Sequence, residues 1–134
     1  YRMDSLPEHL RPYPPSIRQS VIDVLEILAS PDEQLEYQRN VPIADVPAEL
    51  LCMWFDDSFR PNDTRLAALF TSDEWNGLLA FHNRYDHLSS RLPDDLPPIS
   101  ELVTLPIWQE VVRAAAATLT LFCNGQSTGD SPVA

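Results

Sequence analysis

The sequence contains no lysine, so all nine basic residues are arginines, and they stand against 20 aspartates and glutamates in 134 residues. The resulting formal charge of −11 argues against direct binding to nucleic acid or to anionic membranes, both of which require a basic surface. Because arginine forms forked pairs with carboxylates, some of the nine are expected to brace the fold. The surplus of negative charge favours either simple solubility or attraction to a basic partner.

Glycine is scarce, with three residues, and no apolar run is long enough to cross a membrane. Few glycines disfavour tight β-hairpins. The first residues, YRMDSLPEHLRPYPP, show no secretion signal. Cys52 and Cys123 fall inside apolar helical patterns, which predicts two buried, unreactive thiols rather than a disulfide. Together these features predict a cytoplasmic protein.

Motifs that carry known chemistry are also missing. The histidines are His9, His82 and His87, and the five-residue step between the last two does not place them on one helix face. Neither cysteine has a nearby cysteine or histidine, so we expect no metal site and no cofactor. The chain has no G-x-S-x-G elbow and no glycine-rich phosphate loop. The sequence therefore predicts a protein that is not an enzyme.

Thirteen prolines separate segments with helical periodicity, and the apolar content is 44%. Helix starts are predicted at Ser30, Asp45 and Thr71, where a capping side chain precedes the apolar pattern. A further helix is expected to end at Asn124 and Gly125. The predicted fold is an all-α single-domain bundle of five or six helices over residues 16–123. Residues 1–15 are expected to be an extended proline-rich segment, and residues 124–134 a mobile tail.

The stretch LLCMWFDDSFRPND, residues 50–63, combines an apolar helix with adjacent aspartates. Asp56 and Asp57 lie where the helix dipole disfavours anions, which suggests either a brace from Arg60 or Arg65 or a role outside the fold. A small enzyme with a carboxylate site around Asp56 and Asp57 is one alternative, although neighbouring carboxylates point in different directions and normally stay solvated. A helical scaffold or self-associating module is another alternative.

Several short motifs resemble those of small bacterial immunity proteins of toxin–immunity systems, including contact-dependent growth inhibition. The similarity covers roughly residues 41–123 and rests on five segments: Trp54–Asp57, Phe59–Pro61, Phe70–Glu74, Leu92–Pro93 and Pro106–Gln109. The resemblance implies a cytoplasmic protein that binds a toxin domain and blocks its active site or its substrate surface. Many such toxins are basic nucleases. Immunity proteins share no binding motif, so the resemblance assigns no individual residue.

The predicted partner is therefore a cognate basic toxin domain. We expect exposed carboxylates to meet the arginines and lysines with which a nuclease holds phosphates, and Phe59 to be an apolar anchor at the rim. The candidate partner-binding residues are Asp56, Asp57, Phe59, Asp63, Asp94 and Asp95, with Glu33 and Glu36 as a second group.

Overall fold

The structure is a computed structural model that describes residue 7 and residues 11–130, with residues 123–130 described as helix only. The helices in this part of the chain are α1 (Pro15–Leu28), α2 (Pro31–Asn40), α3 (Val46–Cys52), the π-helix η3 (Met53–Ser58), α4 (Thr64–Ala67), α5 (Ser72–Ser89), α6 (Ile99–Leu102) and α7 (Pro106–Asp130). No strand occurs in these residues. The predicted all-α single domain is confirmed, with five longer helices joined by short ones.

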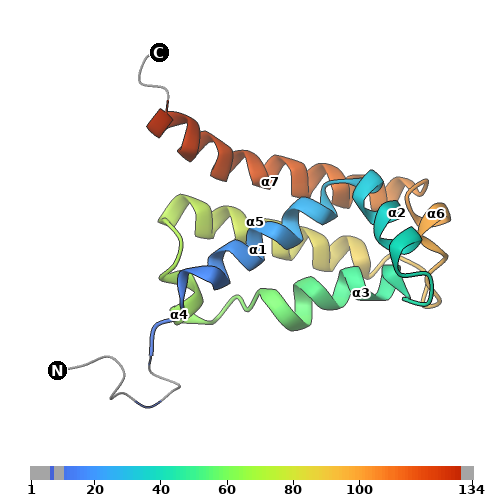
Figure 1. Cartoon of the computed structure of the whole chain (residues 1–134), viewed down its shortest axis with the longest axis horizontal. Helices are drawn as coiled ribbons and strands as arrows, with labels where there is room; N and C mark the ends of the chain where they lie inside the picture. The colour runs from blue at the N-terminus through green and yellow to red at the C-terminus, as the bar shows by residue number, and fades with distance from the viewer. Residues whose placement is uncertain (1–6, 8–10, 131–134) are drawn as a thin grey trace.

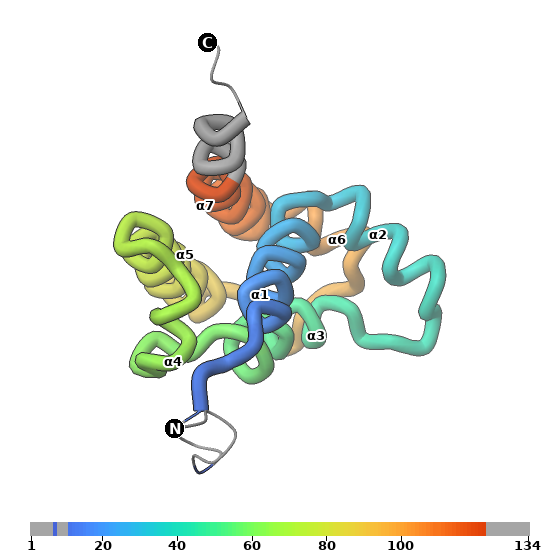
Figure 2. Tube along the Cα trace, turned by 60° about the vertical axis from the view of Figure 1, so that its left-hand side comes forward, coloured from blue at the N-terminus to red at the C-terminus, as the bar shows by residue number. Residues whose placement is uncertain are grey.

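The long helices lie side by side in alternating directions (Figure 1). Helix α5 packs along α7, and α1 lies across both α7 and η3. Helices α2 and α6 close one end of the bundle, where they contact each other and α3. Viewed from the side, the tube in Figure 2 shows α1 between the α5–α7 pair and α3. This arrangement leaves a core centred on α1, α3, α5 and α7.

Local capping explains where three helices begin. The backbone N–H of Glu33 donates to Ser30 Oγ, and that of Ala48 donates to Asp45 Oδ1. At the start of α5, Thr71 and Glu74 form the complete capping box. Each cap gives a partner to an N–H group that has none inside the helix, which is why the short polar residues predicted these positions correctly.

Large aromatic side chains lie at the centre of the core. Trp54, Tyr85 and Trp108 are fully buried. Trp54 stacks on Phe59 with ring centroids 4.8 Å apart and meets Phe81 edge-on at 4.9 Å. These contacts join the π-helix and the segment after it to α5, and aromatic pairs of this geometry add to the stability gained from burial.

A buried glutamine holds α2 against the rest of the bundle. Gln34 is fully buried, and its Nε2 donates to the carbonyls of Ile27 and Leu28 at 2.9 and 3.2 Å. Its Oε1 accepts from Trp108 Nε1 at 2.9 Å. One side chain thus satisfies the last carbonyls of α1 and a buried indole, which removes the cost of burying these polar groups.

An ion pair closes the opposite end. Arg18 of α1 grips Glu74 of α5 through two parallel bonds, 2.7 and 3.0 Å long, and also donates to the Leu69 carbonyl. Its guanidinium lies over the rings of Phe70 and Phe122. The pair confirms that arginine braces the fold, and the Arg18 hydrogen bonds lower the pKa of the Glu74 carboxyl.

The first predicted terminal segment lies mostly outside the described residues, and the second lies partly outside them. Residues 1–6, 8–10 and 131–134 are not described, and α1 already begins at Pro15. Helix α7 continues past Asn124 and Gly125, where an end was expected, to Asp130. A run of alanines and other helix formers precedes this point, and the helix continues through Gly125 and Gly129 at a cost of about 1 kcal/mol for each glycine.

Candidate functional site

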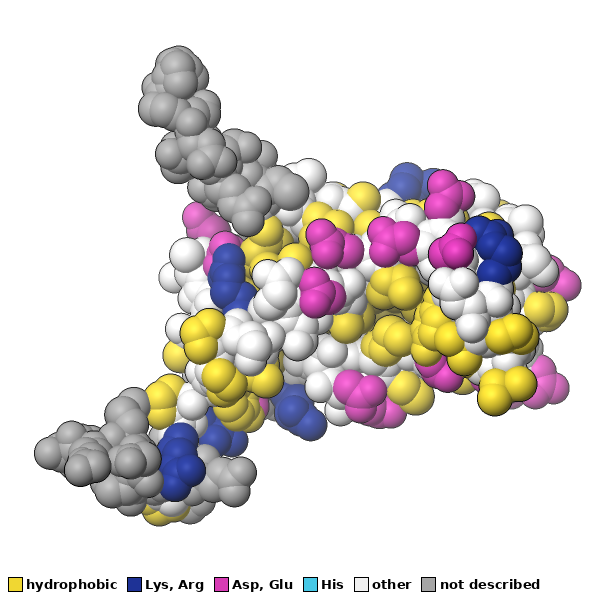
Figure 3. All heavy atoms as spheres, in the orientation of Figure 1, with side chains coloured by type: hydrophobic (Ala, Val, Ile, Leu, Met, Phe, Trp, Pro, Cys, Tyr) yellow, Lys and Arg dark blue, Asp and Glu magenta, His cyan; other side chains and the backbone are white. Residues whose placement is uncertain are grey.

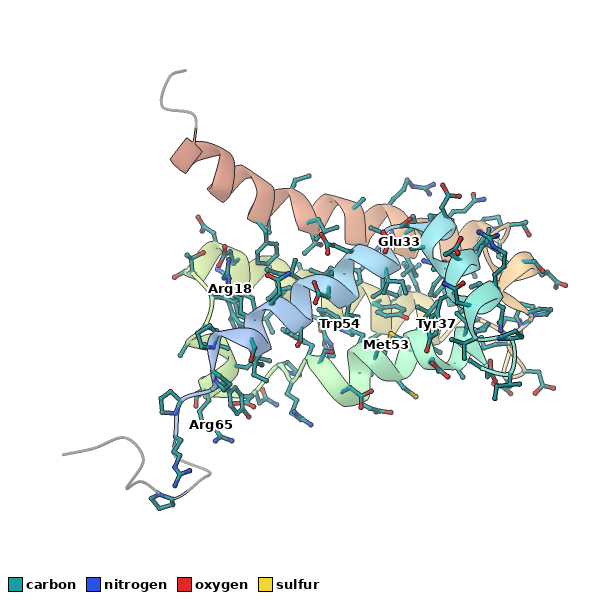
Figure 4. The ribbon with its side chains drawn as sticks, in the orientation of Figure 1. Arg18, Glu33, Tyr37, Met53, Trp54 and Arg65 are labelled. Carbon is teal, nitrogen blue, oxygen red and sulfur yellow. The ribbon has the colours of Figure 1, made fainter. Side chains whose placement is uncertain are left out.

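The structure separates the acidic candidates into two places. Asp56 and Asp57 are exposed on η3, which continues α3 away from α6. Asp94 and Asp95 are exposed in the loop between α5 and α6. Glu33 is exposed on α2, the helix that contacts α6, and Figure 4 shows it far from Arg18. The loop carboxylates and those of α2 therefore belong to the same end of the bundle.

Phe59 is not an exposed anchor, and that prediction was wrong. Its side chain is 1% exposed and packs between Trp54 and Trp75, with ring centroids 4.8 and 5.0 Å away. The cause is the π-helix, in which the Phe59 N–H donates to the Trp54 carbonyl five residues earlier. This wider turn changes the direction in which the chain leaves the helix, and the ring enters the core.

Asp63 has a structural role, in contrast to its predicted place at an interface. It is half-buried and caps α4, where its Oδ1 accepts from the N–H groups of Arg65 and Leu66. Its Oδ2 accepts from the Tyr13 hydroxyl at 2.6 Å. Despite the burial, these hydrogen bonds lower the pKa of the Asp63 carboxyl. The carboxylate is occupied within the fold.

The surroundings of Asp56 differ from two expectations, that Cys52 is buried and that an arginine side chain pairs with the carboxylate of Asp56 or Asp57. The Cys52 thiol is exposed rather than buried, since it lies on the outer side of α3. A hydrogen bond to Asp56 raises the pKa of this thiol, and partial desolvation adds to the effect. Arg60 Nη2 lies 3.5 Å from the backbone carbonyl of Asp56, so the contact between the two residues is not a carboxylate pair. Both aspartates face solvent.

We call the assembly of α2, the loop at residues 41–45 and residues 94–101 the α2–α6 end. It holds a cavity of about 570 Å³. The residues that line it come from all three parts and from Pro47 of α3, and they are mainly apolar: Leu35, Gln38, Arg39, Pro42, Ala44, Asp45, Pro47, Leu96, Pro97, Pro98, Ile99 and Ser100. Four prolines fix the backbone of these walls, so the cavity has a rigid frame before anything binds.

A rigid turn holds Ile43 in solvent beside this cavity. The Ala44 N–H donates to the Val41 carbonyl at 3.0 Å, with Pro42 and Ile43 at the corner of the turn. Gln38 Nε2 lies 3.2, 3.3 and 2.9 Å from the carbonyls of Val41, Pro42 and Ala44. Because this amide draws the carbonyls inward, the Ile43 side chain stays 96% exposed.

Carboxylates surround the same cavity. Asp45 lines it, Asp94 and Asp95 precede the lining residue Leu96, and Glu101 follows the lining residue Ser100. All four are exposed. The lining Arg39 is already paired, because its Nη2 lies 2.5 Å from Glu36 Oε1, and this pair lowers the pKa of the Glu36 carboxyl. In Figure 3, acidic side chains lie around hydrophobic ones at the end that carries α2.

Neither the exposure of Ile43 nor the cavity was predicted from the sequence. The segment Val41–Pro42–Ile43–Ala44 reads as a connection, and nothing local shows that its isoleucine lies outside the core. The signal that could have been used is an apolar residue at a turn corner where polar residues or glycine are usual. The proline-rich lining from residues 96–98 is close to it only in the folded chain.

His82 lies on the core side of α5 and is hydrogen-bonded there. It is half-buried, and its Nδ1 accepts from Trp54 Nε1 at 3.2 Å. Desolvation lowers the pKa of the imidazole, while Asp86 opposes the change. In the described residues, no three histidine, cysteine, aspartate or glutamate side chains gather as a metal would require.

None of the helices in the described part of the chain is both long and apolar enough to span a membrane. No protein-family model matches the sequence, and neither the curated proteins nor the solved structures gave a match.

Proposed function

We propose that the chain is a cytoplasmic immunity protein that binds a basic toxin domain, of nuclease type, and neutralises it without catalysis. The observation that carries this proposal is the group of exposed carboxylates at the α2–α6 end. A body with a charge of −11 attracts a cationic protein over a distance, and local carboxylates then pair with its arginines and lysines. Covering those cations would remove the toxin's hold on phosphate groups.

The distribution of ion pairs supports this role. In the described part of the chain, three pairs join Arg18 to Glu74, Arg39 to Glu36 and Arg84 to Glu110. Glu33, Asp94 and Asp95 are outside these three pairs and are exposed. Such carboxylates are available to an incoming cation. Removing a carboxylate that is fully desolvated at the centre of the complex would cost about 2–5 kcal/mol of binding free energy. Removing a carboxylate at the rim would mainly change the association rate.

The enzyme alternative has weaker support. Asp56 and Asp57 are both exposed, and Asp56 accepts a hydrogen bond from the Cys52 thiol, which has a raised pKa and so little thiolate character. A pair of carboxyls that acts as general acid and general base needs an environment that gives the two groups different pKa values. Self-association is the other alternative, and the exposed Ile43 is the feature that favours it. Sedimentation of the purified chain over a range of concentrations tests that alternative, because a self-associating module forms a stable oligomer and a monomer would weaken the case for it.

The experiment for the proposal is growth rescue. The proposal predicts that the neighbouring gene encodes a large secreted protein with a toxic C-terminal domain. That domain is expressed from an inducible promoter, alone and together with the chain. The proposal predicts that the domain stops growth and that the chain restores it. A toxic domain that the chain does not neutralise would contradict the proposal, as would a neighbouring gene whose product is harmless.

Binding of the purified pair gives a second readout. Charge pairing predicts that affinity falls steadily as salt is raised from about 50 to about 500 mM NaCl, since the Debye length shortens from about 14 to about 4 Å over that range. An affinity independent of salt would contradict the electrostatic basis of the proposal.

A further inference from the structure

The α2–α6 cavity has a property that charge attraction alone does not use. Its lining is apolar and its frame is rigid, since prolines 42, 47, 97 and 98 form part of the walls. Proline lacks a backbone N–H and has a fixed φ angle, so these walls offer ring carbons rather than donors. A surface of this kind binds a side chain through burial of apolar area.

The exposed isoleucine lies beside that cavity. Single exposed apolar residues are common and need no explanation by themselves. Ile43 differs because the Gln38 amide and the Val41–Ala44 hydrogen bond hold its turn rigidly, at a position that costs burial and gains nothing within the monomer. Its neighbours Pro42 and Ala44 both line the cavity, so the turn that carries the isoleucine forms part of the cavity wall.

The charges around this surface determine what fits it. Asp45, Asp94, Asp95 and Glu101 are exposed around the cavity, and the one lining cation, Arg39, is compensated by Glu36. A second copy of the chain would bring the same carboxylates together in a two-fold interface and be repelled. A segment that presents lysine or arginine on both sides of a large apolar side chain satisfies both features.

We propose that the α2–α6 cavity receives one large apolar side chain from a cationic protein segment, with Ile43 covering it. This inference rests on the proposed function, because it identifies which part of the basic partner the site binds. The carboxylates bring the segment to the surface, and the apolar side chain supplies selectivity. Binding therefore distinguishes a basic segment with an apolar centre from one of equal charge without it.

The test uses two labelled peptides, RKKFKKR and RKKSKKR, and the full-length chain. They have equal charge and differ only in the central residue. Fluorescence anisotropy at about 150 mM NaCl is expected to show about tenfold tighter binding of the phenylalanine peptide, equivalent to about 1.4 kcal/mol. Equal affinities for the two peptides would overturn the proposal.

Variants of the chain locate the selectivity. Ile43→Ser is expected to reduce the affinity for RKKFKKR to nearly that for RKKSKKR, with no change for the serine peptide, because charge is unaltered. Ser100→Phe, which places a ring at the cavity, is expected to have the same effect. Both positions are exposed, so the variants are expected to fold, and a thermal melt checks this. Selectivity that survives both substitutions would overturn the proposal.

Charge variants provide a matched control. Asp94→Asn with Asp95→Asn should lower the affinity for both peptides several-fold. Asp56→Asn with Asp57→Asn removes the same charge from η3 and should lower both affinities less. Equal losses of affinity in the two double variants would contradict the placing of the peptide site at the α2–α6 end. A concentration-dependent dimer abolished by Ile43→Ser would identify a second copy as the occupant. Tighter peptide binding after Leu6→Ser and Leu10→Ser would identify the chain's own first residues. Either result overturns the proposal.

The outcome is separable from that of the growth experiment. If RKKFKKR binds selectively and the chain fails to rescue growth, the immunity function is wrong and the cavity remains a binding site for a cationic segment. If growth is rescued equally by the parent chain and by Ile43→Ser, and the peptides show no selectivity, the immunity function stands and the cavity inference is wrong.

Discussion

The two ends of the molecule use carboxylates in opposite ways. At the end that carries Arg18, Glu74 is 9% exposed and accepts from a guanidinium and a backbone N–H, and the guanidinium itself lies over two aromatic rings. At the α2–α6 end, Asp94 and Asp95 are exposed and lie beside an apolar cavity. The first arrangement contributes to stability, and the second contributes little to it. The contrast shows that the carboxylates of this chain fall into two groups, those paired within the fold and those exposed to solvent. The contacts of each carboxylate distinguish the two groups, whereas the composition does not.

The largest expected effect comes from breaking the buried pair. Glu74→Ala removes both bonds to Arg18 and the acceptor of the Thr71 N–H, and we expect a loss of about 3 kcal/mol in the free energy of unfolding. Asp94→Ala at the other end should change it by less than about 0.5 kcal/mol. Urea denaturation of both variants measures the difference. Similar losses would mean that the two ends do not differ in the proposed way.

Gln34 connects the α2–α6 end to the core, and its loss is expected to be next in size. Gln34→Ala removes the acceptor of the Trp108 indole N–H and the amide that donates to the Leu28 carbonyl, both in a buried place, and should cost about 2 kcal/mol. Hydrogen exchange should then show faster exchange in α2 than in α5. Uniform loss of protection over the whole bundle would contradict the idea that Gln34 acts mainly as the attachment of α2.

His82 gives a pH dependence that belongs to neither end. Because its pKa in the folded state is lowered from the ordinary 6.5, the unfolded chain binds the proton more readily, and the Trp54 N–H keeps its acceptor only while the imidazole is neutral. Stability should be complete above about pH 6.5 and decrease as the pH falls below it. His82→Gln should lose this dependence between pH 6.5 and 5, in denaturation followed at several pH values, and its persistence would exclude His82 as the cause. Protonation of Glu74 adds a further loss below about pH 4.5.

The smallest effect on stability is expected at Gln38. Gln38→Ala removes the amide that holds the turn at residues 41–45, in a half-exposed place, so we expect at most about 1 kcal/mol. The preference for the phenylalanine peptide should nevertheless fall, because Ile43 is no longer held. A variant with unchanged peptide selectivity would show that the rigidity of the turn is unimportant.

Local rules predicted the helices well and the site only in part. Caps such as Ser30 and Thr71 depend on neighbours three residues away, so the sequence displays them directly. The burial of Phe59 was not predicted because the π-helix before it results from packing in the fold and has no sequence motif. The polar residue Gln34 gave no sign of burial, since its partners are on α1 and α7.

The acidic candidates show the same limit. The sequence identifies which residues are carboxylates, but which of them are occupied depends on contacts as distant as Tyr13 with Asp63. The cavity depends on loops that meet only in the fold. The sequence therefore predicted that the surface is acidic, but it did not predict where on the fold the available carboxylates and the cavity lie.

The most direct measurement compares two double variants in their affinity for the toxin domain that the proposal predicts in the product of the neighbouring gene. Calorimetry of Asp94→Asn with Asp95→Asn should show a loss of at least about tenfold, since carboxylates at the α2–α6 end are proposed to pair with the toxin's cations. Asp56→Asn with Asp57→Asn should lose less than about twofold, because these aspartates belong to η3 and a remote charge mainly alters the association rate. Equal losses, or a greater loss for the η3 variant, would contradict the account.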